Sequence, residues 1–249
     1  MEKKLSEYIS LSKNITELKS DNKIKVAILS NFTLNGLDET LRVKTSELGL
    51  NYHSYVSGYD QYNQEILNPK SDLYNFSPDI TFLILSTRNF FGDFFHSSYN
   101  MSDLEKKSLL EEKLKQLKNL IEIFKQNTNS KLVITNFNIP YYSPNGIIET
   151  KSEFGFHEMI EEINIELREI SKNLDPIYLY NFNNFVSKFG EKNVFDYRQF
   201  HLGDIQIAFN FIPYLANDLM SYIKPMFGTN RKCIVLDLDN TLWGGIVGE

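Results

Sequence analysis

Five short runs of apolar and β-branched residues recur along the first 180 residues, and longer stretches with helical spacing of apolar positions separate them. Apolar runs of about four to eight residues, bounded by polar residues, are typical of strands buried on both faces. The predicted strands are 23–30, 51–56, 80–85, 131–135 and 177–180.

Between these runs, apolar residues lie three or four positions apart, which predicts amphipathic helices. The longest begins at Ser102-Asp103, a sequence that favours a helix N-terminus. The predicted helices are one within the first twenty residues, 36–50, 102–126, 152–174, 183–189 and 205–223, the last interrupted or begun afresh near Pro213. Strands joined through helices need crossover connections, and crossovers build parallel sheets. We therefore expect an α/β fold, a three-layer αβα sandwich over residues 23–228, preceded by an N-terminal helix in 1–22.

A sixth apolar run, residues 232–239, predicts the first strand of a second domain that starts at residue 229. It ends in Asp237 and Asp239, which at positions i and i+2 point to the same side of the strand. Such a pair suits phosphoryl transfer, because one carboxylate can attack phosphorus while the other handles the leaving-group proton and a divalent cation reduces their repulsion. The alternative is a pair of ordinary solvated turn residues; the preceding apolar strand, Thr241 and the following Gly-Gly turn count against it.

The segment from Cys233 to Glu249, CIVLDLDNTLWGGIVGE, resembles the first motif of haloacid-dehalogenase (HAD) phosphatases. Its DNTLWGG form resembles the bacterial FkbH-like proteins of HAD subfamily IIIC in particular. The resemblance implies that Asp237 is the nucleophile, that Asp239 is the general acid/base, that both lie at Mg²⁺, and that Thr241 lies near the phosphate. The family's later motifs, a Ser/Thr, a Lys and an acidic pair, are not in this sequence. We therefore expect residues 229–249 to begin a Rossmann-like HAD domain, and this chain alone to have no phosphatase turnover.

FkbH-like proteins carry a domain resembling SGNH hydrolases ahead of the phosphatase domain, and the segments VAILSNFT (26–33), YDQYN (59–63), FSPDI (76–80) and DYRQF (196–200) resemble it. An SGNH enzyme has its nucleophilic serine in a Gly-Asp-Ser turn after the first strand. At the matching turn this chain has Phe32 in the nucleophile position or, with a slip of one residue, Thr33, and Ser30 where glycine is expected.

The SGNH family's late Asp-x-x-His signature supplies the base and its orienting acid. His201 is a candidate base, but Arg198 lies three residues before it, and Asp196 lies five before it. Because most of the triad is missing, two readings stay open: a module that binds or docks without cleaving, and an active serine esterase or acyltransferase.

Polar residues follow two of the predicted strands, Ser30 and Asn31 after the first and Arg88 and Asn89 after the third. The carboxyl ends of parallel strands meet at one edge of a sheet, so these side chains can converge on one pocket. Arg88 suits a phosphate or carboxylate ligand; the alternative is a surface arginine paired with a neighbouring acid. With Thr33, Thr241 and His201, these four are the candidate substrate-binding residues.

The composition of the chain excludes several classes of partner and of site. The chain is 42% hydrophobic and 23% charged, with a net charge of −6, so a nucleic acid would be repelled on average. The single cysteine excludes an intramolecular disulfide and a cysteine zinc cluster. No apolar stretch is long enough to span a membrane and no secretory signal opens the chain, which favours a cytoplasmic protein.

The resemblance to FkbH-like proteins also implies a function. Such a protein dephosphorylates a phosphorylated three-carbon acid and loads the glyceryl unit on an acyl carrier protein, in polyketide or surface-polysaccharide biosynthesis. The expected partners are the small phosphorylated substrate and the carrier protein.

Overall fold

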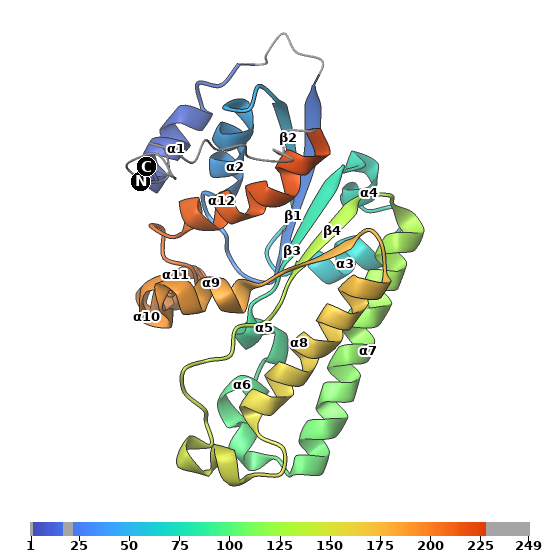
Figure 1. The fold of residues 1–249 in the computed structure, drawn as a ribbon, viewed down its shortest axis with the longest axis vertical. Coiled ribbons are helices and arrows are strands. Elements are labelled where there is room, and N and C mark those ends of the chain that lie inside the picture. The colour runs from blue at the N-terminus through green and yellow to red at the C-terminus, as the bar shows by residue number, and fades with distance from the viewer. Residues whose placement is uncertain (1, 17–21, 228–249) are drawn as a thin grey trace, which may run out of the picture.

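The computed structural model describes residues 2–16 and 22–227, and its centre is a five-stranded parallel sheet (Figure 1). The strand order is β2-β1-β3-β4-β5, with every neighbouring pair parallel. The strands are β1 (Lys23–Ser30), β2 (Asn51–Val56), β3 (Ile80–Ile84), β4 (Lys131–Thr135) and β5 (Ile177–Tyr180). Because all these pairs are parallel, the predicted parallel sheet is confirmed. Parallel strands need crossover connections, and the helices between the strands supply them.

Helices cover both faces of the sheet and complete the three predicted layers. One face carries α1 (Leu5–Ser12), α2 (Leu37–Ser46), α9 (Phe182–Phe189) and α12 (Ile212–Ile223). The other carries α3 (Tyr62–Leu67), α4 (Asp72–Phe76), α7 (Asp103–Asn127) and α8 (Phe156–Asn173). Alternate strand residues divide between the two cores: Ala27 and Leu29 pack with the second group of helices, whereas Val26 and Ile28 pack with the first.

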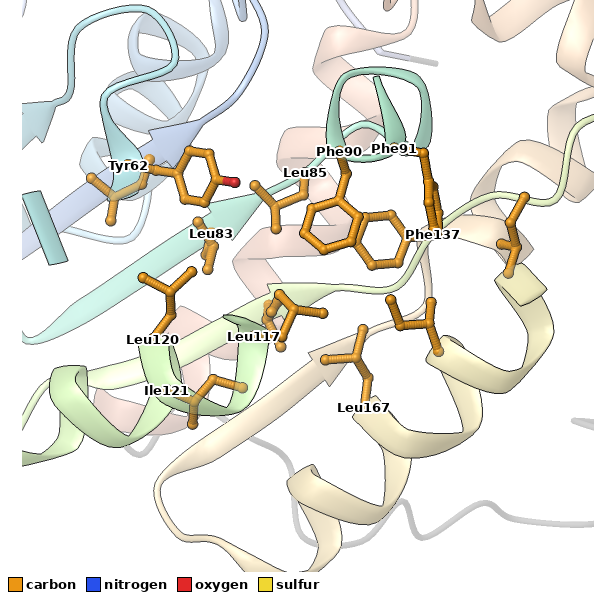
Figure 2. Packing of buried hydrophobic residues seen from close by; sticks show 14 of the residues in the cluster. Tyr62, Leu83, Leu85, Phe90, Phe91, Leu117, Leu120, Ile121, Phe137 and Leu167 are labelled. Carbon is orange, nitrogen blue, oxygen red and sulfur yellow. The ribbon is translucent and has the colours of Figure 1, made fainter. Parts of the chain in front are cut away.

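The core under α7 and α8 extends to the carboxyl end of the sheet (Figure 2). There, Leu85 is followed by Phe90 and Phe91, and Phe137 follows β4. The Phe90 and Phe137 rings are 4.6 Å apart between centroids. This aromatic cluster fixes the segments that follow β3 and β4 against the two long helices.

Short helical segments complete the part of the chain that the structure describes. They are α5 (Thr87–Phe91), α6 (Phe94–Ser97), η1 (Ser98–Asn100), η2 (Gly146–Lys151), α10 (Glu191–Val194), α11 (Tyr197–Gly203) and η3 (Lys224–Phe227). The sequence did not predict them, because three to seven residues are too few to establish a helical period.

The long helix α7 begins where the sequence predicts. Ser102 and Glu105 form a capping box: the Glu105 amide donates to the Ser102 hydroxyl at 3.3 Å, and the Ser102 amide donates to a Glu105 carboxylate oxygen at 2.8 Å. Both amides belong to the group at a helix N-terminus that has no partner within the helix.

The helix predicted over 205–223 begins afresh near Pro213, as expected, but the helical prediction for residues 205–211 is wrong. Ile205 and Ile207 form isolated bridges, parallel to Thr33 and antiparallel to Phe195 respectively. Helix α12 begins at Ile212 with Pro213 in its first turn, where the missing amide hydrogen costs nothing. The bridges tie this segment to the end of β1, and this contact positions the site described below.

Residues 228–249 lie outside the described residues, and with them the predicted sixth strand, the domain boundary at 229 and the candidate residues Asp237, Asp239 and Thr241. Within the described ranges, no helix is long and apolar enough to cross a membrane.

Candidate functional site

A small pocket lies where the strands β3 and β4 end, between the segments that follow them and the short helices α10 and α11. Its lining is Ser86, Thr87, Arg88, Phe95, Asn138, Pro140, Tyr142, Glu191, Phe195, Asp196, Tyr197, Phe200 and Gln206. Of the candidates in the described residues, only Arg88 lines it. Ser30, Asn31, Thr33 and Asn89 lie beside the pocket at the ends of β1 and β3, and His201 lies on α11.

The structure brings Asn31 and Asn89 together, as the strand-end rule predicts. The Asn89 amide donates to the Asn31 carbonyl at 2.6 Å, and the Asn31 side-chain oxygen accepts the Ser86 amide at 2.8 Å. These bonds join the segment after β1 to the segment after β3. Asn31 is buried, and its side-chain amide group hydrogen-bonds to the backbone of the site.

Asp204 joins this pair to Gln206 and to Tyr59, which lies in the segment after β2. Its backbone adopts the left-handed conformation, with φ of 51°, and its carboxylate accepts from the Asn89 amide at 2.6 Å and the Gln206 amide at 2.8 Å. The Tyr59 hydroxyl donates to the same carboxylate at 2.8 Å. Partial burial and this hydrogen bond raise the pKa of Tyr59 to about 12. Burial, followed by the Asp204 charge, raises the pKa of Asp60.

The hydroxyl groups at the expected nucleophile turn are bonded to backbone. Ser30 donates its hydroxyl to the Phe32 carbonyl at 2.7 Å, and Thr33 donates its own to the Gly203 carbonyl at 2.8 Å. Phe32 is buried in the core under α2 and α12. In the described part of the chain, no Ser or Thr hydroxyl is hydrogen-bonded to a histidine, which is the arrangement that activates a hydroxyl nucleophile.

His201 does not take the position of a catalytic base. Its side chain is exposed and contacts the ring of Phe200, with 5.1 Å between centroids. Asp196 caps α11, and one carboxylate oxygen accepts the amides of Arg198 and Gln199 at 3.0 Å. The third residue after Asp196 is Gln199, so the Asp-x-x-His pattern has an amide where the base is expected.

The side chain of Arg88 stacks on an aromatic ring. The centre of its guanidinium lies 3.7 Å from the Phe200 ring centroid, a stacked cation–π contact. Arg88 makes no ion pair with any carboxylate of residues 2–16 or 22–227, so the alternative of a surface arginine paired with a neighbouring acid is wrong. Burial and the positive charge of Arg88 lower the pKa of His96 nearby.

Two further groups fix the pocket walls. Glu191 accepts the Tyr141 amide at 2.6 Å and the Tyr197 hydroxyl at 3.1 Å. Burial and the Glu191 charge raise the pKa of Tyr197 to about 12. The Thr87 hydroxyl donates towards two oxygens of Asn138, the carbonyl at 2.9 Å and the side-chain oxygen at 3.0 Å.

Several residues that line the pocket were not predicted from the sequence. Asn138 lies three residues after β4, so the rule that found Arg88 could have found it. Asp196 and Gln206 follow no strand, and only the bridges of Ile205 and Ile207 to distant segments bring them to the sheet edge. Among the described residues, no group of three His, Cys, Asp or Glu side chains could hold a metal ion. The predicted Mg²⁺ ligands are outside this part.

Residues 25–224 match the family described as "FkbH, N-terminal domain". Comparison with curated protein sequences gives no match. Among solved structures, the N-terminal part of BF1531 from Bacteroides fragilis, which contains a phosphatase domain and was crystallised with Mg, superposes with a TM-score of 0.83 at 23% identity. That comparison covers 99% of this chain and 63% of the Bacteroides chain, so the chain spans less than two thirds of it.

Two hydrolases share the fold at lower similarity. The lipase Lip_vut3 from a goat rumen metagenome has a TM-score of 0.57 at 12% identity, covering 80% of this chain and 96% of the lipase. The acetyl xylan esterase AlAXEase has a TM-score of 0.51 at 12% identity, covering 80% of this chain and 100% of the esterase. These likenesses establish the α/β fold that the chain shares with these hydrolases and carry no activity with them.

Proposed function

Because the chain belongs to the family of FkbH N-terminal domains, we propose that residues 23–228 form a domain that binds a ligand without cleaving it, within a Mg²⁺-dependent phosphatase of the FkbH type. The phosphatase chemistry falls to the segment that starts at residue 229, where the sequence carries Asp237, Asp239 and Thr241.

The single observation that supports binding over cleavage is the state of the nucleophile turn. A hydroxyl nucleophile needs a base within hydrogen-bond reach and a third group that orients the base. Here Phe32 fills the expected position from within the core, and the neighbouring hydroxyls of Ser30 and Thr33 are bonded to carbonyl oxygens. An acyl-enzyme on either hydroxyl would require these bonds to break and a base to arrive.

For the phosphatase part, the proposal follows from the resemblance of residues 233–249 to the first HAD motif. Asp237 attacks phosphorus, Asp239 moves the proton of the leaving group, and Thr241 contacts the phosphate. By the same resemblance the Asp237 carboxylate and the Asp239 backbone carbonyl would hold Mg²⁺, which when bound would offset the negative charge at the phosphoryl group. The Bacteroides structure, which contains a phosphatase domain complexed with Mg, supports this assignment.

The substrate and partner come from the same resemblance. We propose a phosphorylated three-carbon acid as substrate and an acyl carrier protein as acceptor of the glyceryl unit, in polyketide or polysaccharide biosynthesis. The net charge of −6 opposes nucleic acid as a partner.

A serine-directed fluorophosphonate probe tests the binding role. We expect no covalent labelling of the 249-residue chain under conditions in which an active SGNH esterase labels fully. The expected result follows because neither hydroxyl is activated. Labelling of the folded chain at Ser30 or Thr33, located by mass spectrometry, would refute the binding role and support the esterase alternative.

Substitution of Asp237 tests the phosphatase role in the longer protein that carries the later motifs. Asp237→Asn keeps the side-chain shape and removes the nucleophile, so Mg²⁺-dependent phosphate release is expected to fall by orders of magnitude. Asp72→Asn, at an exposed position on α4, is the matched control and keeps full activity. Equal turnover in the two variants would remove Asp237 from the mechanism.

A further inference from the structure

The guanidinium of Arg88 lines the pocket and makes no ion pair with a carboxylate of the described residues. Its stacking on Phe200 at 3.7 Å holds the planar group in one orientation, with its N–H donors around the rim of the plane. None of the carboxylates of the described chain lies within ion-pair distance. A stacked guanidinium of this kind is prepared for a planar anion that accepts two parallel hydrogen bonds.

Asn138 supplies a second donor to the same pocket. It is only 7% exposed, and its side-chain oxygen is engaged by the Thr87 hydroxyl. Its amide nitrogen has no hydrogen-bond partner within residues 2–16 and 22–227, although it lies in the pocket lining. This nitrogen is accessible from the pocket, so it can donate to a ligand atom that accepts from it.

The other charged groups of the pocket determine which kind of anion it can bind. Glu191 and Asp196 also line it, so Arg88 faces two carboxylates in the same cavity. A dianionic phosphate would be repelled by both, whereas a carboxylate brings only one negative charge. The planar carboxylate also matches the fork of the guanidinium.

Two acceptor oxygens remain for the rest of the ligand. One oxygen of Asp196 carries both capping hydrogen bonds, and the other has no partner in the described part of the chain. Gln206 uses its amide nitrogen towards Asn89 and Asp204, which leaves its side-chain oxygen unengaged there. Both oxygens complement a hydroxyl or ammonium donor on the ligand.

The size of the cavity limits the ligand to a small molecule. Its free volume is about 50 Å³. By the same measure one water needs roughly 10–15 Å³, so the cavity accommodates a molecule the size of about three to five waters.

We propose that this pocket binds a small monocarboxylic acid that carries a hydroxyl or ammonium donor, with its carboxylate on Arg88 and the Asn138 amide. The inference rests on the proposed function in one respect, that the domain binds rather than cleaves. The donor faces Asp196 and Gln206. The Phe195 and Tyr142 side chains close the apolar part of the cavity.

Isothermal titration calorimetry of the 249-residue chain tests this with four probes at pH 7 and constant ionic strength: acetate, lactate, alanine and inorganic phosphate. We expect saturable binding of lactate or alanine, several-fold weaker binding of acetate because it lacks the donor, and weaker binding of phosphate than of the best carboxylate. Asp196→Asn distinguishes the two donor types: it weakens alanine binding more than lactate binding, because only the ammonium needs the charge.

Arg88→Gln is expected to weaken the best carboxylate by at least about tenfold, the effect of losing a charge-assisted pair. Arg42→Gln is the matched control, because Arg42 also stacks on a ring, that of Tyr52 at 5.6 Å, but lies on α2. Asn138→Asp, which keeps the shape and adds a negative charge, is a second variant expected to weaken binding.

The proposal is overturned if no carboxylate binds saturably, if phosphate binds more tightly than every carboxylate, or if Arg88→Gln and Arg42→Gln bind alike. Its failure is distinct from that of the proposed function. Fluorophosphonate labelling refutes the non-cleaving role whatever the titrations give, and absent carboxylate binding leaves the unlabelled nucleophile turn unchanged.

Discussion

The prediction that the structure defines most sharply concerns Asn164 of α8. It is 7% exposed, and its side chain makes two hydrogen bonds with one backbone residue. Its oxygen accepts the Phe137 amide at 2.8 Å, and its amide donates to the Phe137 carbonyl at 2.8 Å. Phe137 is fully buried, so no water replaces these bonds if the side chain is removed.

Asn164→Ala leaves both backbone groups of Phe137 without a partner. Each unsatisfied buried group costs about 1–3 kcal/mol, which gives a loss of about 2–6 kcal/mol. The better helix propensity of alanine recovers only about 0.5 kcal/mol of it. Against a total stability of about 5–15 kcal/mol for a domain, the expected change is large.

Urea denaturation followed by circular dichroism measures the free energy of unfolding, with the midpoint compared at equal slope. Asn173→Ala is the control on the same helix, since Asn173 is exposed and its amide donates to the Glu169 carbonyl at 2.8 Å; a change within about 0.5 kcal/mol is expected there. If Asn164→Ala and Asn173→Ala unfold at the same urea concentration, the account of Phe137 is wrong.

Three further predictions follow from other contacts. Phe32→Ser is expected to lower the free energy of unfolding by about 3–5 kcal/mol, as for a buried aromatic side chain that is removed, and to gain no fluorophosphonate labelling; labelling would contradict the account of the turn. Although burial opposes it, hydrogen bonds from Ser143 and the His157 amide lower the pKa of Glu149 below its ordinary 4.5, so this group stabilises the fold above that pH and the contribution is lost as the pH falls. The unfolding midpoint of Glu149→Gln, followed from pH 7 to pH 3, is therefore expected to fall less steeply than that of the native chain, and parallel curves would contradict this. Ser102→Ala removes the cap of α7 and is expected to cost about 1 kcal/mol by urea denaturation, whereas no change would show that the capping box is not a source of stability.

The sequence predicts the sheet well because the strand signal is local. The apolar runs at 23–30, 51–56, 131–135 and 177–180 are the observed strands β1, β2, β4 and β5, and only β3 ends one residue earlier than expected. Burial on both faces makes each run continuous and easy to recognise. The segment 205–211 fails for the opposite reason: its conformation depends on bridges to Thr33 and Phe195, which no local pattern contains.

The residues of the candidate site also fall into two groups, those that a local sequence pattern predicts and those that depend on distant segments. The strand-end rule brings Asn31 and Asn89 together and places Arg88 in a pocket, because parallel strands end at a common edge. It cannot find Asp196 or Phe200, which α11 brings from a distant part of the sequence. Whether an arginine pairs with an acid or stacks on a ring depends on such a neighbour.

The Asp204 carboxylate has a consequence for biosynthesis of the chain. Its hydrogen bonds reach back 115 residues to Asn89 and 145 residues to Tyr59, and Thr33 bonds the Gly203 carbonyl 170 residues away. A nascent polypeptide cannot make these connections until this stretch has left the ribosome. Contacts of such long range form late, because closing the intervening loop must precede them. The arrangement of side chains around Asp204 is therefore completed only when translation of the domain is nearly finished.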